Sequence, residues 1–172
     1  AMNGTAALEI GPDAAAPFAA TVFKTLAEAH LGELSLIRLW AGHAEPGKEL
    51  VNTTRARSEK LGTLYHLCGK DRSDCKGAAA GDIVAAVKLR ETHTGDTLTD
   101  KARQVKLSPP DFPLPVAAEC IRAKNKGDEE KMAVGITRLH EEDPTLSRHY
   151  EASTKESLIY GMGDLHLEVL VE

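Results

Sequence analysis

The chain has 172 residues, of which 42% are hydrophobic and 27% are charged, a balance typical of a soluble globular protein. This length leaves room for one domain of average size or for two small ones. No stretch approaches the ~20 apolar residues that a membrane-spanning helix needs, and no charged-then-apolar signal segment opens the chain. The sequence therefore excludes a membrane-spanning helix and predicts a cytoplasmic protein.

Charge is unevenly distributed along the chain. Residues 1–110 hold 14 Lys and Arg against 13 Asp and Glu, a net charge of +1, whereas residues 111–172 hold 7 against 13, a net charge of −6. The first part gathers its positive side chains in two clusters: Arg55, Arg57 and Lys60, and then Lys70, Arg72 and Lys76. Such clusters either contact phosphate groups or simply face solvent.

The three cysteines, Cys68, Cys75 and Cys120, form no CxxC pair. An odd number of thiols without metal-ligand spacing predicts reduced side chains in a reducing compartment. Spacing alone leaves open a disulfide between Cys68 and Cys75 across a hairpin.

Residues 1–16 are rich in small residues and lack a repeating apolar face, which predicts a linker or a loosely ordered chain end. Residues 17–107 predict β-structure, because short apolar stretches alternate with turn-forming segments. The predicted strands span residues 19–26, 34–40, 48–52, 61–68 and 83–89, and the predicted turns include residues 70–81 and 94–96. Irregular alternation in the second strand predicts a β-bulge. Five or more short strands favour an all-β barrel, because closure removes exposed edges.

Four prolines in residues 108–115 predict a stiff linker and a domain boundary. Beyond it, the pattern predicts strands at 116–122, 145–151 and 157–160, a helix at 128–142 with Asp128 as its N-cap, and a second helix opening at 161–164. The apolar side of the second helix is predicted to include Leu165, Val169 and Leu170. The order βαββα predicts an α+β ferredoxin-like domain over residues 116–172, C-terminally incomplete because the full motif has one more strand.

No motif predicts catalysis. The phosphate loop GxxxxGK[ST] is absent from the sequence, so the match of residues 125–128 to the NKxD guanine signature is interpreted as chance. His166 and Glu168 match the H-x-E of zinc deaminases, but the P-C-x-x-C partner is missing and helix positions i and i+2 diverge. We therefore predict no catalytic residue, metal site or cofactor within these residues.

Two sets of segments resemble translation elongation factor G, in the order and spacing of that family. Residues 17–25 (PFAATVFKT), 31–35 (LGELS), 38–42 (RLWAG), 80–85 (AGDIVA) and 94–98 (TGDTL) are similar to its second domain. Residues 161–168 (GMGDLHLE) are close to the G-M-G-E-L-H-L-E of its third domain, with Asp164 where the family has Glu. Over residues 17–172 the chain thus resembles domains II and III of a G-like paralogue.

The resemblance implies the non-catalytic middle of a ribosome-dependent translational GTPase that binds the ribosome and relays the GTP state during translocation. GTP and Mg²⁺ would then be bound by a missing N-terminal domain. The implied partners are small-subunit rRNA and ribosomal proteins and the parent's own GTPase domain, with no membrane and no DNA. Arg55, Arg57 and Lys60 are the candidate rRNA contacts, since each phosphate contact adds salt-dependent affinity.

The motif residues of the third domain are Gly161, Met162, Gly163, Asp164, Leu165, His166 and Glu168. Gly161 and Gly163 either make a functional contact through their backbone or only form the turn that opens the helix. Two alternative functions also fit the sequence. One is a related ribosomal-protection, release or back-translocation GTPase, and the other is a stand-alone RNA-binding barrel with a ligand-sensing ferredoxin-like domain.

Overall fold

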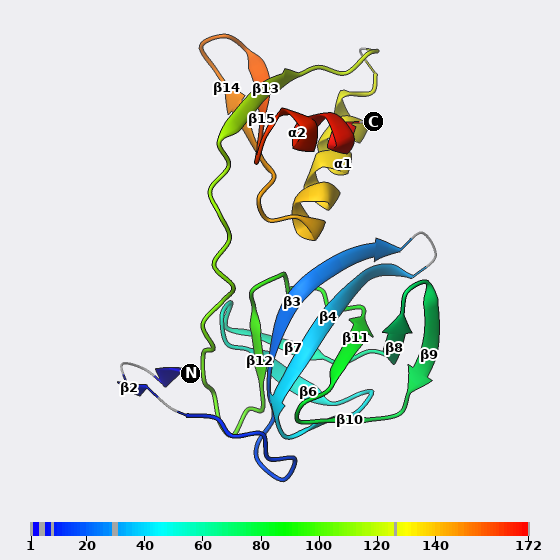
Figure 1. Ribbon diagram of the computed structural model, residues 1–172, viewed down its shortest axis with the longest axis vertical. Coiled ribbons are helices and arrows are strands. Elements are labelled where there is room, and N and C mark those ends of the chain that lie inside the picture. Colours follow the sequence, from blue (N-terminus) through cyan, green and yellow to red (C-terminus); the bar gives the residue numbers. More distant parts are fainter. Residues whose placement is uncertain (1, 4–5, 8, 29–30, 126, 172) are drawn as a thin grey trace. The chain divides into compact units, whose positions relative to one another are not determined.

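The computed structural model describes residues 2–3, 6–7, 9–28, 31–125 and 127–171 (Figure 1). The chain divides into two compact units, residues 1–110 and 111–172, and the division falls within the proline-rich segment. In its described residues the first unit is built of strands, whereas the second combines three strands with two helices. The predicted all-β and α+β classes are both confirmed.

One large antiparallel sheet dominates the first unit, in the order β7-β6-β12-β3-β4-β11-β8-β9. Its strands are β3 (Ala19–Glu28), β4 (Gly32–Ala41), β6 (Glu49–Asn52), β7 (Arg57–Lys60), β8 (Leu64–Cys68), β9 (Asp71–Cys75), β11 (Ile83–Val87) and β12 (Thr97–Thr99). Two short pairs accompany it: β1 (Met2–Asn3) with β2 (Ala6–Ala7), and β5 (His43–Ala44) with β10 (Ala78–Ala79). The order leaves β7 and β9 as the two ends of the sheet.

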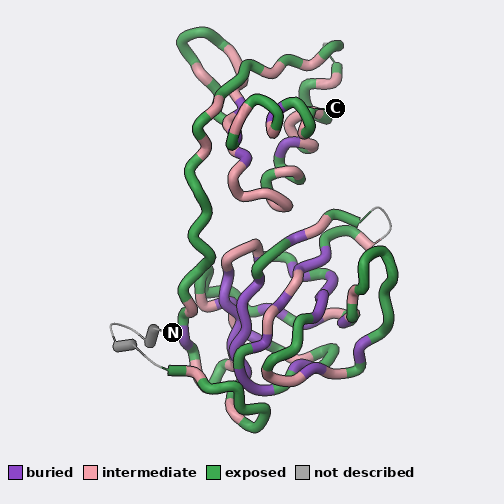
Figure 2. Tube along the Cα trace, in the orientation of Figure 1, coloured by how far each residue is buried: buried purple, intermediate pink, exposed green. Residues whose placement is uncertain are grey.

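The main apolar core of the first unit is built mainly from strands of the large sheet. Buried side chains from both halves of the sheet meet in one cluster, and Figure 2 colours them purple like all other buried residues. Its largest fully buried members are Phe18, Val22, Ile37, Leu39, Leu50, Leu61, Leu64, Val84 and Leu98. Each fully buried Leu, Ile or Phe contributes about 1.5–3 kcal/mol relative to an exposed one. A sheet that wraps its own core is the arrangement that a barrel requires.

Two β-bulges shape the long pair β3–β4. Trp40 is the extra residue on β4 and Phe23 is the extra residue on β3, so β4 does not bulge at the consecutive apolar residues Leu36 and Ile37 from which a bulge was predicted. The two consecutive apolar residues of β4 have a different origin. Ile37 belongs to the main core, whereas Leu36 packs against a second cluster around Leu34. Both faces of β4 are thus covered by apolar side chains, which breaks simple alternation.

Residues 70–81, predicted as a turn, contain β9 and β10, so that prediction is wrong. The strand β7 was also not predicted. Both β7 and β9 lie at the ends of the sheet and consist mostly of exposed charged or polar residues. An edge strand with a polar sequence lacks the apolar alternation by which strands are recognised.

The hairpin β8–β9 separates the two cysteines that spacing had left open to a disulfide. Cys68 pairs with Asp71 near the turn, whereas Cys75 pairs with Leu64 at the other end of the hairpin. All three cysteines of the chain are free thiols, and Cys75 is buried.

The second unit has the predicted βαββα order: β13 (Ala117–Ile121), α1 (Glu129–Glu142), β14 (Ser147–Glu151), β15 (Glu156–Gly161) and α2 (Asp164–Val171). The strands form an antiparallel sheet in the order β13-β15-β14. The core between sheet and helices consists of Ile136, Leu146, Ile159 and Leu167. In the described residues, no helix is both long enough and apolar enough to cross a membrane.

Candidate functional site

The A-G-D-I segment of the first unit forms a tight turn that leads into β11. Gly81 has a φ of +103°, a conformation that glycine adopts without strain. The carboxylate of Asp82 accepts a hydrogen bond from the backbone N–H of Ala79 (2.8 Å), and its carbonyl accepts one from the N–H of Leu39 (3.0 Å). This segment therefore fixes how β11 enters the sheet beside β4.

Asp96, in the T-G-D-T-L segment, lies at the centre of a buried polar network. Its carboxylate accepts hydrogen bonds from the side-chain amide of Asn52 (2.9 Å), the backbone N–H of His93 (3.0 Å) and Nε of Arg55 (2.8 Å). Only 4% of the Asp96 side chain is exposed, so these donors replace the water that the charge has lost. The network holds the loop before β12 against the turn between β6 and β7.

The three predicted rRNA contacts lie on the β6–β7 hairpin, in different surroundings. Arg55 sits in the turn and pairs with the buried Asp96, while 46% of its side chain stays exposed. Arg57 and Lys60 are the first and last residues of β7, and both are exposed. Within the described part of the chain, neither Arg57 nor Lys60 forms an ion pair. Their charges are therefore available to a partner, whereas that of Arg55 also serves the fold.

The position of β7 gives its charges a second role. β7 is one end of the large sheet, and charged side chains on such a strand discourage pairing with another chain. Between the two cations, Glu59 points inward, where its carboxylate accepts hydrogen bonds from the Glu91 N–H (2.7 Å) and the Thr92 hydroxyl (2.9 Å). Edge protection by Arg57 and Lys60 holds whether or not they also meet a phosphate group.

The first glycine of the G-M-G-D-L-H-L-E segment is required by close packing. A Cβ atom at Gly161 would lie 2.6 Å from Cδ2 of Leu167 and 2.9 Å from Nδ1 of His166. Leu167 is fully buried in the core of the second unit. A Cβ atom at Gly163, by contrast, would meet no atom within 4 Å. Packing therefore dictates Gly161 and leaves Gly163 unconstrained.

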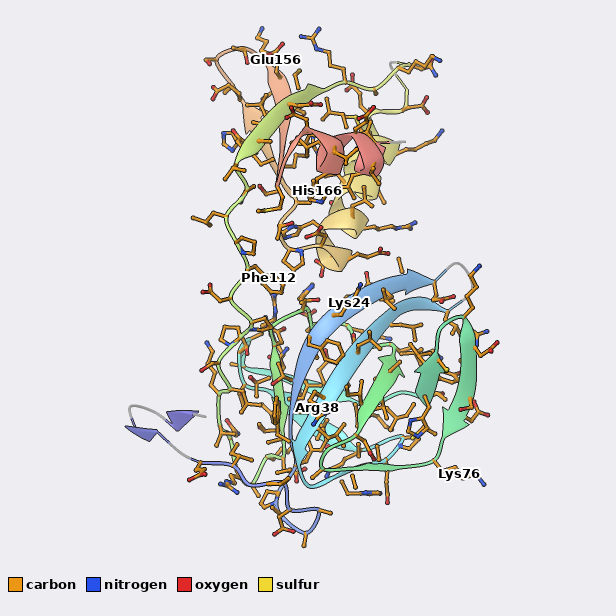
Figure 3. The ribbon with its side chains drawn as sticks, in the orientation of Figure 1. Lys24, Arg38, Lys76, Phe112, Glu156 and His166 are labelled. Carbon is orange, nitrogen blue, oxygen red and sulfur yellow. The ribbon has the colours of Figure 1, made fainter. Side chains whose placement is uncertain are left out.

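His166 ties the beginning of α2 to the end of α1 (Figure 3). Its Nδ1 accepts a hydrogen bond from the backbone N–H of Met162 (3.0 Å), so Nε2 carries the proton and donates to the Asp143 carboxylate (3.0 Å). Asp143 follows the last residue of α1, and its other carboxylate oxygen accepts from the N–H (2.8 Å) and hydroxyl (2.6 Å) of Thr145. The motif histidine thus acts as a structural link between the helices.

The Asp143 carboxyl has a pKa below its ordinary value. Partial burial is the largest single influence and acts in the opposite direction, because it disfavours the charged form. The hydrogen bonds from Thr145, together with the hydrogen bond from His166, outweigh it. Asp143 is therefore ionised at neutral pH and serves purely as an acceptor in this network.

The predicted apolar side of α2 is wrong at two of three positions. Leu165 and Val169 are 72% and 63% exposed, whereas Leu167 is fully buried and Leu170 packs against the core. The reason is the position at which the helix begins: α2 starts at Asp164, and the packing of Leu167 against Gly161 sets which face turns inward. Met162 and Leu165, within the G-M-G-D-L-H-L-E segment, and Val169, which follows it, are consequently exposed.

Asp128 precedes α1, as predicted, but its carboxylate does not cap the helix. It accepts hydrogen bonds instead from the Asn125 side chain (3.0 Å) and from Nζ of Lys131 (2.9 Å). The NKxD-like residues are thus engaged with each other at the start of α1, apart from residue 126, which lies outside the described residues. Asp128 is therefore the N-cap residue, as predicted, and its carbonyl accepts the first hydrogen bond of the helix from the Met132 N–H (2.9 Å), but its side chain makes no capping hydrogen bond.

Both ring nitrogens of His166 are occupied by the Met162 and Asp143 hydrogen bonds, so the H-x-E pair does not present a free imidazole. Across the described ranges, no group of three or more His, Cys, Asp or Glu side chains is arranged to hold a metal ion.

Residues 17–101 match the family described as Elongation factor G domain 2, and residues 112–172 match Elongation Factor G, domain III. Each match falls within one compact unit, and the two follow each other in family order. The chain belongs to the elongation factor G family. It is a segment of an elongation-factor-like translation factor that spans domain II and domain III.

A crystal structure of a protein from Thermus thermophilus resembles this elongation factor G segment, with a TM-score of 0.79 and 29% sequence identity. The similarity covers 90% of this chain and 24% of the other, so the segment spans about a quarter of that protein's length. Gly81, Asp96, Gly161 and His166, which lie in the segments that resemble the family, help to build the two domains through their backbone conformation, packing and hydrogen bonds.

Proposed function

We propose that this elongation factor G segment binds the ribosome and, in the protein that contains it, relays the state of bound GTP during translocation. The observation that supports the proposal is the pair of family domains, II and then III, each folded as a unit in one chain. The segment itself is non-catalytic, and GTP and Mg²⁺ are bound by a GTPase domain outside these residues. A cytoplasmic location follows from this role.

The charges of the two domains suit two kinds of partner. Domain II lies in the part of the chain with a net charge near zero, yet it presents Arg57 and Lys60 on an exposed edge, where they reach the phosphates of small-subunit rRNA. Domain III carries an excess of acidic residues, which favours ribosomal proteins and the parent's own GTPase domain.

Ribosome binding is tested by sedimenting the 172-residue chain with small ribosomal subunits over a series of salt concentrations. In a plot of log affinity against log salt concentration, each lost phosphate contact reduces the magnitude of the slope by about 0.7–0.9. The double variant Arg57→Gln with Lys60→Gln is therefore expected to reduce it by about 1.4–1.8. The matched control, Lys70→Gln with Arg72→Gln, removes the same charge from the β8–β9 hairpin at the other end of the sheet order. An unchanged slope in the first variant, or an equal loss in the control, contradicts the assignment of these contacts.

Arg55 is left intact in this experiment because its removal would unpair the buried Asp96 carboxylate and confuse binding with folding. The relay is tested separately by measuring GTP hydrolysis of the intact protein with and without ribosomes. Strong stimulation is expected. A folded protein that binds GTP and shows no stimulation would instead have kept the architecture and changed its task.

A further inference from the structure

Domain III contains a polar groove of about 620 Å³ between the end of β13, the start of α1 and the β14–β15 hairpin. The register of the sheet explains its walls. Tyr150, Ser157 and Ile121 form one row across the three strands, and Arg148 lies on the same face in the next row. Lys155 comes from the turn that joins β14 to β15 and also lines the groove.

The positive charges in this groove are not all compensated. Arg122 donates to Glu156, and that pair is internally neutral. Arg148 donates to the hydroxyl of Ser157 (3.2 Å), which orients its guanidinium without neutralising it. In the described part of domain III, neither Arg148 nor Lys155 forms an ion pair. The lining thus carries a local excess of one positive charge, three cations against Glu129 and Glu156, inside a domain whose net charge is strongly negative.

An exposed aromatic ring stands at the same groove. Tyr150 is 55% exposed although it belongs to a strand, so its ring offers a face on which a planar group can stack. An uncompensated guanidinium and ammonium beside an aromatic face are the parts with which proteins hold single-stranded nucleic acid, through phosphate contacts and base stacking. A hydroxyl at Ser157 adds a hydrogen-bonding group to the same row.

We propose that this groove binds a nucleotide unit of an RNA strand, with its phosphate on Arg148 and Lys155 and its base on Tyr150. The acidic domain III then makes an RNA contact of its own, separate from the β7 edge of domain II and additional to the protein contacts that its charge favours. The excess of carboxylates elsewhere on the domain confines RNA to this groove, because like charge repels a phosphate backbone from the rest of the surface.

The test uses the 172-residue chain and a short oligouridylate, with uridine monophosphate as the probe for free nucleotide. Two phosphate contacts to a single strand contribute about 1.4 to the slope of log affinity against log salt concentration. When salt is raised from ~50 to ~200 mM, the affinity of the wild type should therefore fall about sevenfold more than that of the double variant Arg148→Gln with Lys155→Gln. Tyr150→Ala should weaken oligouridylate binding by at least about fivefold at constant salt. The control is Arg138→Gln, which removes a positive charge from the exposed side of α1, outside the groove lining.

Far-UV ellipticity of the helices confirms that each variant is folded, since all substituted side chains are exposed or at the groove surface. Loss of oligouridylate binding in the Arg148 and Tyr150 variants, with the Arg138 control unchanged, supports the proposal. Equal binding by all variants overturns it. If uridine monophosphate binds as tightly as oligouridylate, the proposal that the ligand is an RNA strand is overturned, and the groove is assigned to free nucleotides. The outcome does not depend on the ribosome experiment, because no ribosome is present.

Discussion

Replacing Gly161 by Ala tests whether the signature of domain III is held by packing. The added Cβ would lie 2.6 Å from Leu167 Cδ2 and 2.9 Å from His166 Nδ1, both far inside normal contact distance. Leu167 is fully buried and so has little space into which it can move. Overpacking of a core costs about 1–3 kcal/mol. Displacing His166 from the Met162 N–H adds about 1 kcal/mol. We therefore expect domain III to lose about 2–4 kcal/mol.

The chain offers a separate spectroscopic signal for each domain. The described helices α1 and α2 belong to domain III, so helical ellipticity follows its unfolding. The single tryptophan of the sequence, Trp40, lies in domain II and follows that domain. A loss of about 2–4 kcal/mol in a domain of about 60 residues lowers the melting temperature by at least about 8 °C. The ellipticity transition should therefore move down while the tryptophan transition stays in place.

Gly163→Ala is the matched control, because a Cβ atom there meets nothing within 4 Å. Its stability should remain within about 0.5 kcal/mol of the wild type. If Gly161→Ala melts with the wild type, or if both substitutions destabilise equally, the packing argument is refuted. A stable Gly163→Ala protein also gives a clean measurement of whether this glycine has a backbone role in ribosome-stimulated turnover.

Three further predictions test individual side chains. Hydrogen bonds lower the folded-state pKa of Asp143 below its ordinary value of 3.8. The stability that the Asp143 charge provides is therefore present above about pH 4 and is lost as the pH falls through the lower folded-state pKa. In urea unfolding, the difference in free energy of unfolding between wild type and Asp143→Asn should shrink over that pH range. Leu167→Ala should cost domain III about 2–5 kcal/mol, whereas Leu165→Ser should stay within about 0.5 kcal/mol; equal losses in thermal melts would show that the assigned inner face of α2 is wrong. Arg55→Gln should destabilise domain II by about 1–3 kcal/mol, followed by tryptophan fluorescence, because a buried carboxylate loses a donor, while Arg57→Gln should not; a neutral Arg55→Gln would remove the structural role assigned to that pair.

The strands that could be predicted from the sequence are those with an apolar inner face. β3, β4, β11 and β15 contribute Val22, Ile37, Val84 and Ile159 to a core, and periodicity detects such residues directly. Edge strands give no such signal. β7 and β9 are formed by hydrogen bonds to one neighbour and carry charged residues outward, so their sequences resemble loops.

The second helix shows a different limit of sequence reasoning. Several apolar residues crowd this short helix, so more than one face can be chosen from the sequence. The tertiary contact between Leu167 and Gly161 decides which face turns inward, and no local pattern encodes it. The Asp143–His166 pair is likewise invisible in sequence, since 23 positions separate its members. The candidate cations on β7 were found from charge clustering, whereas Arg148 and Lys155 come together only through the hairpin register and turn.

The signature residues and the proposed contact residues divide into separate groups for a physical reason. Gly81 adopts a positive φ, and Asp96 accepts hydrogen bonds within a buried polar network. Gly161 packs closely against the domain III core, and His166 accepts a hydrogen bond from the backbone beside it. A substitution at any of these residues therefore acts first through folding. A surface cation such as Arg148 has no comparable constraint from its own domain, because nothing in the described fold requires its charge. The residues that resemble the family are therefore those that build domains II and III, whereas the surface residues that contact a partner are less constrained by the fold. The task of this segment within the family must be read from its exposed charges and tested there.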